Sequence, residues 1–89
     1  MRILHLTIYK QWLYEILEGT KNEEYRFIKP YWIKRLRGKE YDVVHFRNGY
    51  SSNAPELYVE CMGIEEEGDI FIIKLGKILD YYTRGKINS

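Results

Sequence analysis

Three charged side chains of complementary types lie close together near residue 20 of this chain. Lys21, Glu24 and Arg26 all belong to the stretch GTKNEEYR. Residues two apart on a strand point to the same side, so Glu24 and Arg26 should share a face, with Lys21 in the connection before them. A carboxylate held between an ammonium and a guanidinium group stays ionised, and in a cleft such a trio could orient a base or a phosphate, or transfer protons. The alternative, on local chemistry, is an ion pair that only fixes the strand to a helix end.

A polar loop after a later strand supplies a second set of candidate binding residues. Arg47, Asn48, Tyr50 and Ser51 belong to the sequence RNGYSSN and offer guanidinium, amide, phenol and hydroxyl groups. Single-stranded RNA is bound by stacking on aromatic or arginine planes together with phosphate contacts. Further aromatic planes could come from Tyr9, Tyr25 and Trp32. Because Asn-Gly is also a typical hairpin turn, a purely structural loop is the alternative.

The charge distribution is polarised although the formal net charge is only +1. Residues 1–50 are basic and residues 51–89 are acidic, and the basic side chains between residues 26 and 39 meet no acid in that stretch: Arg26, Lys29, Lys34, Arg35, Arg37 and Lys39. A local positive field attracts polyanions, so we expect Arg35 and Arg37 to add non-specific affinity for RNA. The alternatives are a solvated helix face, or a protein-interaction domain whose opposite halves pair head to tail.

The hydrophobic pattern predicts the elements that must position these residues. Alternation over residues 2–9 favours a strand, and helical spacing favours a helix over residues 10–18 that ends at Gly19. The pattern continues with a strand at 23–28, a helix from Pro30 to near Gly38, and strands at 41–47, 57–64 and 69–79, with Glu65, Glu66 and Glu67 in a solvated turn. This order predicts an α+β fold, a small mixed β-barrel of about five strands with two short helices.

Length and composition limit the class of protein. A chain of 89 residues with 30% charged residues fits one globular domain over residues 1–89. The single cysteine, Cys61, and the lack of a long apolar segment predict a cytoplasmic protein without a membrane contact. His5 and His45 have no partners at ligand spacing, and no phosphate-binding glycine loop is present, so we expect neither a metal nor a cofactor. The oligomeric state stays open.

Gly19, Lys21, Glu24 and Arg26 fit the pattern G-x-K-x-x-E-x-R, which marks the ASCH family. The opening ILHLTIYKQWLYEILEG resembles the strand and helix that precede this motif in the family, and YDVVHFRNG and VECMGIE resemble its later barrel strands. The resemblance covers most of the chain. It implies a single ASCH-like domain with the PUA-like barrel of RNA-binding proteins.

The resemblance also implies two functions. ASCH domains are generally regarded as RNA-binding modules, which suggests an RNA- or nucleotide-binding cleft between the Lys21, Glu24 and Arg26 segment and the loop at residues 47–52. Some members hydrolyse acylated cytidine nucleosides or cleave RNA, so the alternative is a small hydrolase, an amidohydrolase or ribonuclease, that uses Lys21 and Glu24. In the amidohydrolases, the motif lysine works with a threonine where this chain has Glu24.

Overall fold

The computed structural model describes residues 1–49 and 53–83, so Tyr50 and Ser51 lie outside the described residues. The elements follow the predicted order, with β1 at Ile3–Thr7, α1 at Lys10–Glu18, β2 at Glu23–Phe27, α2 at Pro30–Leu36, β3 at Val43–Arg47, β4 at Glu56–Glu67 and β5 at Ile70–Tyr82. The prediction of an α+β fold with five strands and two short helices is confirmed. Neither described helix is long and apolar enough to cross a bilayer.

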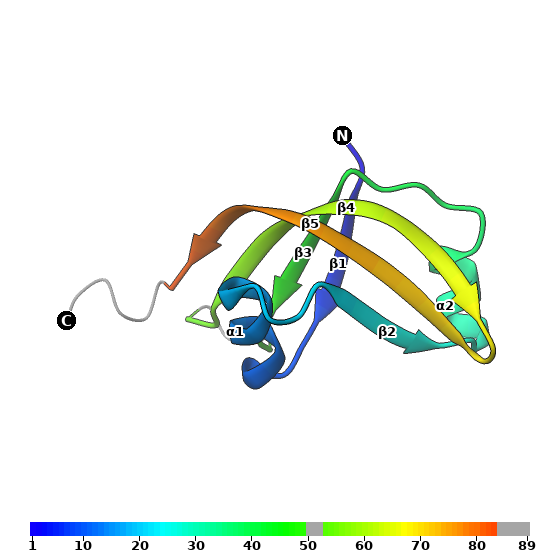
Figure 1. The fold of residues 1–89 in the computed structure, drawn as a ribbon, viewed down its shortest axis with the longest axis horizontal. Helices are drawn as coiled ribbons and strands as arrows, with labels where there is room; N and C mark the ends of the chain where they lie inside the picture. The colour runs from blue at the N-terminus through cyan, green and yellow to red at the C-terminus, as the bar shows by residue number, and fades with distance from the viewer. Residues whose placement is uncertain (50–52, 84–89) are drawn as a thin grey trace.

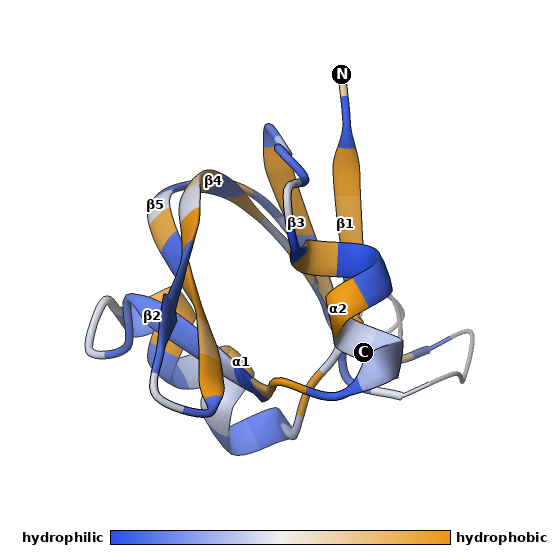
Figure 2. Ribbon diagram, turned by 90° about the vertical axis from the view of Figure 1, so that its right-hand side faces the viewer, coloured by the Kyte–Doolittle hydropathy of each residue, from blue (hydrophilic) through white to orange (hydrophobic). Residues whose placement is uncertain are grey.

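The five strands form one mixed sheet that curls into a half-barrel (Figures 1 and 2). The strand order is β1-β3-β4-β5-β2, with β1 parallel to β3 and every other neighbouring pair antiparallel. A fully closed barrel has no sheet edges, but among the described residues β1 and β2 remain at the two ends of the sheet. One side chain crosses this seam, because the Arg26 guanidinium donates a hydrogen bond to the Thr7 carbonyl oxygen over 2.9 Å.

Strands β4 and β5 form a long hairpin whose turn differs from the prediction. The glutamates at 65–67, expected in a solvated turn, are the last residues of β4 and pair with residues 70–72 of β5. The chain reverses at Gly68, which has φ 59°, so the turn itself needs only Gly68 and Asp69. Strand β5 has neighbours on both sides, which fits its apolar sequence IFIIKLGKIL.

The core fills the concave side of the half-barrel, and both helices close over it. Leu4 and Leu6 of β1 and Val44 and Phe46 of β3 are buried, as the alternating pattern requires. The helices lie toward opposite ends of the sheet (Figure 1). They contribute the buried side chains Leu13, Ile16 and Leu36. The first helix ends as predicted, with Gly19 in the left-handed region at φ 88° and its N–H directed to the Glu15 and Ile16 carbonyls.

Candidate functional site

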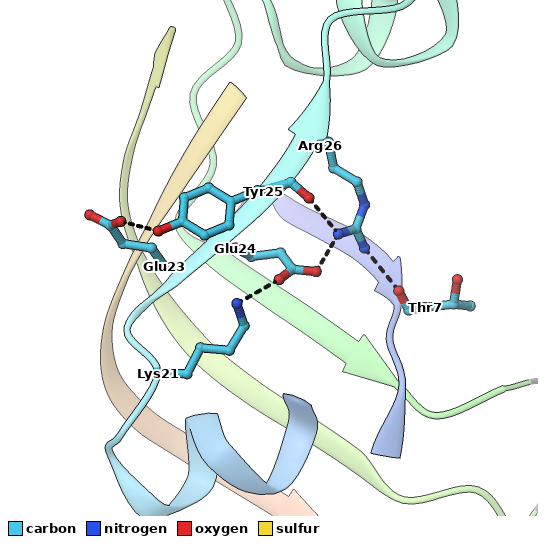
Figure 3. Close-up of polar contacts among 6 residues, drawn as sticks. All are labelled: Thr7, Lys21, Glu23, Glu24, Tyr25 and Arg26. Atoms are coloured by element: carbon cyan, nitrogen blue, oxygen red, sulfur yellow. Dashed lines mark hydrogen bonds and ion pairs between the residues drawn. The ribbon is translucent and has the colours of Figure 1, made fainter. Parts of the chain in front are cut away.

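The predicted charged trio lines one open cleft. Lys21 lies in the connection between α1 and β2, and the side chains of Glu24 and Arg26 point to the same side of β2 (Figure 3). The cleft has a volume of about 780 Å³, and its far wall is formed by the end of β1 and the start of α1. The alternation of side chains along β2 places Glu24 and Arg26 on one face, and the connection before the strand adds Lys21, as the sequence predicted.

Two cations hold the Glu24 carboxylate in the wall of this cleft. The Lys21 ammonium nitrogen lies 3.1 Å from Glu24 Oε1, and the Arg26 guanidinium forms an ion pair with Glu24 Oε2. Glu24 is only 6% exposed, so both of its oxygens are committed to these partners rather than to water. The three side chains together carry a net charge of one positive unit, from two cations and one carboxylate. The cleft therefore has an electrostatic preference for an anionic ligand.

Arg26 also connects the cleft to the two edge strands of the sheet. Its Nη1 donates to the Tyr25 carbonyl oxygen over 2.9 Å, and its Nη2 reaches the Thr7 carbonyl oxygen over the same distance. The guanidinium carbon lies 5.2 Å from the centre of the Trp32 ring, within the range of a cation–π contact. These contacts fix the guanidinium in place and leave it little rotamer freedom.

Aromatic rings surround the ammonium group at the cleft. The Lys21 nitrogen lies 5.5 Å from the centre of the Trp12 ring and 5.2 Å from that of Tyr25, and both rings line the cleft. Tyr9, proposed from the sequence as a stacking plane, lines the cleft and is 79% exposed. Helical spacing places Trp12 on the apolar face of the helix, yet it is 39% exposed. Because Trp12 precedes the buried Ile16 by four residues, its exposure had no signal in the sequence.

A hydrogen-bond network on the outer side of β2 holds the Tyr25 ring. The Tyr25 hydroxyl donates to Glu23 Oε1 over 2.7 Å, and the Lys74 ammonium donates to Glu23 Oε2 over 2.5 Å. The hydrogen bond from Lys74 lowers the pKa of Glu23, and the hydrogen bond from Tyr25 adds a smaller effect in the same direction. The same carboxylate raises the pKa of Tyr25 and that of Lys74. Tyr25 therefore stays a neutral phenol whose ring is anchored at the cleft.

The predicted binding loop contributes to the cleft only in part. Asn48 and Gly49 line it, and the Asn48 amide donates to the Ile8 carbonyl oxygen over 2.9 Å. Arg47 points elsewhere, into a separate hollow on the outer face of β1 and β3, where its Nε lies 3.6 Å from Glu56 Oε1. The alternation of side chains along β3 separates Arg47 from the cleft.

Of the predicted basic stretch, Arg35 and Arg37 do not line the cleft, whereas Arg26 does. Arg37 forms two hydrogen bonds with the Glu66 carboxylate, at 2.7 and 2.9 Å, and this contact raises the pKa of Arg37 and lowers that of Glu66. The Arg35 guanidinium lies over the Tyr31 ring at 3.6 Å. No acid lies within residues 26–39 of the sequence. In the fold, however, the long β4 strand brings Glu66 next to Arg37 at the end of α2.

Comparisons with models of known protein families, with curated proteins and with solved structures found no match for this chain. Within residues 1–49 and 53–83, no group of three or more histidine, cysteine, aspartate and glutamate side chains is placed to hold a metal ion. The described residues that line the cleft supply cations, one carboxylate and aromatic rings.

Proposed function

We propose that the chain is an RNA- or nucleotide-binding module and that the cleft around Lys21, Glu24 and Arg26 is its binding site. The observation that carries the proposal is the convergence of these three side chains on an open cleft that also exposes Trp12 and Tyr25. Excess positive charge beside aromatic planes is the combination that binds single-stranded nucleic acid, since phosphates need cations and bases need stacking surfaces.

The dimensions of the cleft suit a nucleotide. Sites for small molecules have volumes of roughly 300–1,000 Å³, and this cleft, at about 780 Å³, falls within that range. A phosphate placed near the Lys21 ammonium lies beside the Trp12 and Tyr25 rings, which both approach that ammonium. The exposed Tyr9 ring extends the same wall. One nucleotide could therefore contact a cation and a ring together.

Glu24 has a positioning role in this arrangement. Its two oxygens contact Lys21 and Arg26 separately, so it holds the two cations apart at a fixed spacing. When a phosphate binds one of these cations, that cation can leave Glu24. An amino group of a base could then donate to the carboxylate in its place. The carboxylate thus couples phosphate binding to recognition of a base edge.

The same residues carry the resemblance to the ASCH family, and membership of that family is part of the proposal. The curled half-barrel with two helices supports it at the level of a small barrel-like fold. The motif positions Gly19, Lys21, Glu24 and Arg26 also support it, because the glycine ends α1 and the three charged residues face one cleft.

A titration with short fluorescent single-stranded RNAs tests the binding function. We expect Lys21→Gln to weaken binding at least about tenfold at low salt, and to make the slope of log affinity against log salt shallower by about 0.7 for each lost phosphate contact. Trp12→Leu should cost about 1–3 kcal/mol of stacking energy. Lys77→Gln, an exposed lysine on β5 that does not line the cleft, is the matched control. Equal affinity in Lys21→Gln and Lys77→Gln would contradict the proposal.

A second candidate function is a hydrolase, and one distance favours it. The Lys21 nitrogen and Glu24 Oε1 are 3.1 Å apart, close enough to pass a proton between them. The pair could accept the proton that water loses on attacking an acyl carbon or a phosphorus atom and then return it to the leaving group. Incubation with acylated cytidine and with labelled RNA tests this function. Turnover that disappears in Lys21→Ala supports it, whereas turnover that persists in Lys21→Ala belongs to another site.

A further inference from the structure

Three titratable side chains form a relay across the outer face of β1 and β3, outside the cleft. His5 and His45 lie opposite each other in the parallel β1–β3 pair, and their Nδ1 atoms are 2.9 Å apart. Nε2 of His45 lies 2.8 Å from Oε1 of Glu56, which is 7% exposed. The His45 ring is also stacked on Tyr58, with ring centres 4.3 Å apart. The relay therefore consists of an exposed imidazole, a covered imidazole and a buried carboxylate, in that order.

The hydrogen bonds determine where the protons lie along this relay. An ionised carboxylate only accepts hydrogen bonds, so His45 donates its Nε2–H to Glu56. The neutral His45 ring then accepts at Nδ1, and His5 must donate its own Nδ1–H. This assignment leaves a lone pair on Nε2 of His5. When a proton binds there, the Nδ1 proton can pass to His45, and the positive charge moves next to Glu56.

The exposed end of the relay opens into a hollow. It has a volume of about 310 Å³, and its polar lining comes from His5, Thr7, His45 and Arg47, with an aromatic wall of Tyr31 and Trp32. Among the described residues, Nε2 of His5 has no hydrogen-bond partner. A histidine pair that served only to satisfy the covered His45 would not require a hollow that a cationic side chain also lines.

We propose that this hollow is a second ligand site, which binds the oxyanion of a small molecule when Nε2 of His5 is protonated. The oxyanion is a tetrahedral phosphate or sulfate group or a planar carboxylate. It accepts the Nε2–H hydrogen bond of His5 and lies in the field of Arg47, while Glu56 stabilises the charge that the proton brings. The aromatic wall leaves room for an apolar part of the ligand. This site is independent of the function proposed for the cleft.

The charged and titratable groups around the relay come from every packed element. Strand β3 supplies Arg47, which also contacts Glu56, and β4 supplies Tyr58 next to His45. Helix α2 places Tyr31 in the wall, with the Arg35 guanidinium over that ring. Strand β5 brings Tyr82 against Tyr58, and the Tyr82 hydroxyl donates to Asp80. Among the described residues that line the hollow, Arg47 is a cation and none is a carboxylate, which favours an anion.

Anion titrations followed by nuclear magnetic resonance test this site. Sulfate is the tetrahedral probe because its charge is constant between about pH 5.5 and about pH 7.5, the range in which an imidazole gains a proton, and acetate is the planar probe. We expect one of them to shift the His5 and Arg47 signals with an affinity at least about tenfold higher at the lower pH. The nitrogen chemical shifts of the imidazole rings in the wild type should show that, at the higher pH, His45 carries its proton at Nε2 and His5 carries its proton at Nδ1.

Variants within and outside the relay show whether the pH-dependent binding comes from this hollow. His5→Gln keeps a hydrogen-bond donor but no titratable nitrogen, and it should abolish the pH dependence. Glu56→Gln should move the pH midpoint of binding lower, whereas Glu65→Gln, an exposed change on the same strand, should not. Lys21→Gln should leave the anion titration of the His5 and Arg47 signals unchanged. Anion binding that is absent, that keeps its pH dependence in His5→Gln, or that is lost in Lys21→Gln would overturn the proposal.

Discussion

Arg26 connects the candidate site to the stability of the fold, and Arg26→Met tests that connection. The substitution keeps a long side chain against Trp32 and removes the guanidinium. It therefore removes the ion pair with Glu24 and the hydrogen bond to the Thr7 carbonyl oxygen that joins the two edge strands. We expect the protein to fold with a lower free energy of unfolding.

The size of the loss follows from the burial of the pair. Removing one partner of a fully buried ion pair costs about 3–5 kcal/mol, because the other charge is left without a partner. Here the side chains of Arg26 and Glu24 are 17% and 7% exposed, and Lys21 remains 3.1 Å from the carboxylate. The loss is therefore smaller, about 2 kcal/mol, close to that of one hydrogen bond to a charged group. In a chain of 89 residues this lowers the melting temperature by about 8–16 °C.

Urea denaturation of four proteins measures this effect and assigns it to the pair. The set is the wild type, Arg26→Met, Glu24→Gln and the double variant, and we expect a coupling energy of about 1–2 kcal/mol between the two positions. Arg35→Met, which removes an exposed arginine over Tyr31, is the matched control and should cost less than about 1 kcal/mol. A loss in Arg26→Met no larger than in Arg35→Met, or strictly additive losses at 24 and 26, would refute the reasoning.

Two further predictions concern the ends of the elements that hold the site. Gly19→Ala should lower the free energy of unfolding by about 1 kcal/mol in urea denaturation. The cause is the backbone, since φ is +88° and a Cβ would meet no neighbouring atom. A more stable variant would contradict the left-handed conformation of Gly19. Since Lys74 lowers the pKa of Glu23 from 4.5, their contact stabilises the fold above that pH and is lost as pH falls through the folded pKa. The melting temperature of Lys74→Met should therefore lie below that of the wild type at neutral pH and approach it in acid, and a constant difference would argue against the contact.

The sequence predicted what depends on local spacing and missed what depends on distant strands. The alternation along β2 was sufficient to place Glu24 and Arg26 on one face, and Gly19 was sufficient to end α1. The contact between Arg37 and Glu66 joins residues 29 positions apart and exists only because β4 continues through the three glutamates. Helical spacing groups Trp12 with the buried Leu13 and Ile16 of α1, but spacing cannot show that a cleft opens beside it.

The sheet curls into a half-barrel whose seam stays open, and this explains why a cleft lies at this place. Closure would have set the backbones of β1 and β2 about 5 Å apart, with their hydrogen bonds filling the seam. Instead, the end of β1 and the middle of β2 form the opposite walls of the cleft, and one guanidinium spans the gap to Thr7. The backbone groups at this seam are thus available to side chains such as that of Arg26. An edge that is costly in an isolated sheet becomes the opening onto which Lys21, Glu24 and Arg26 face.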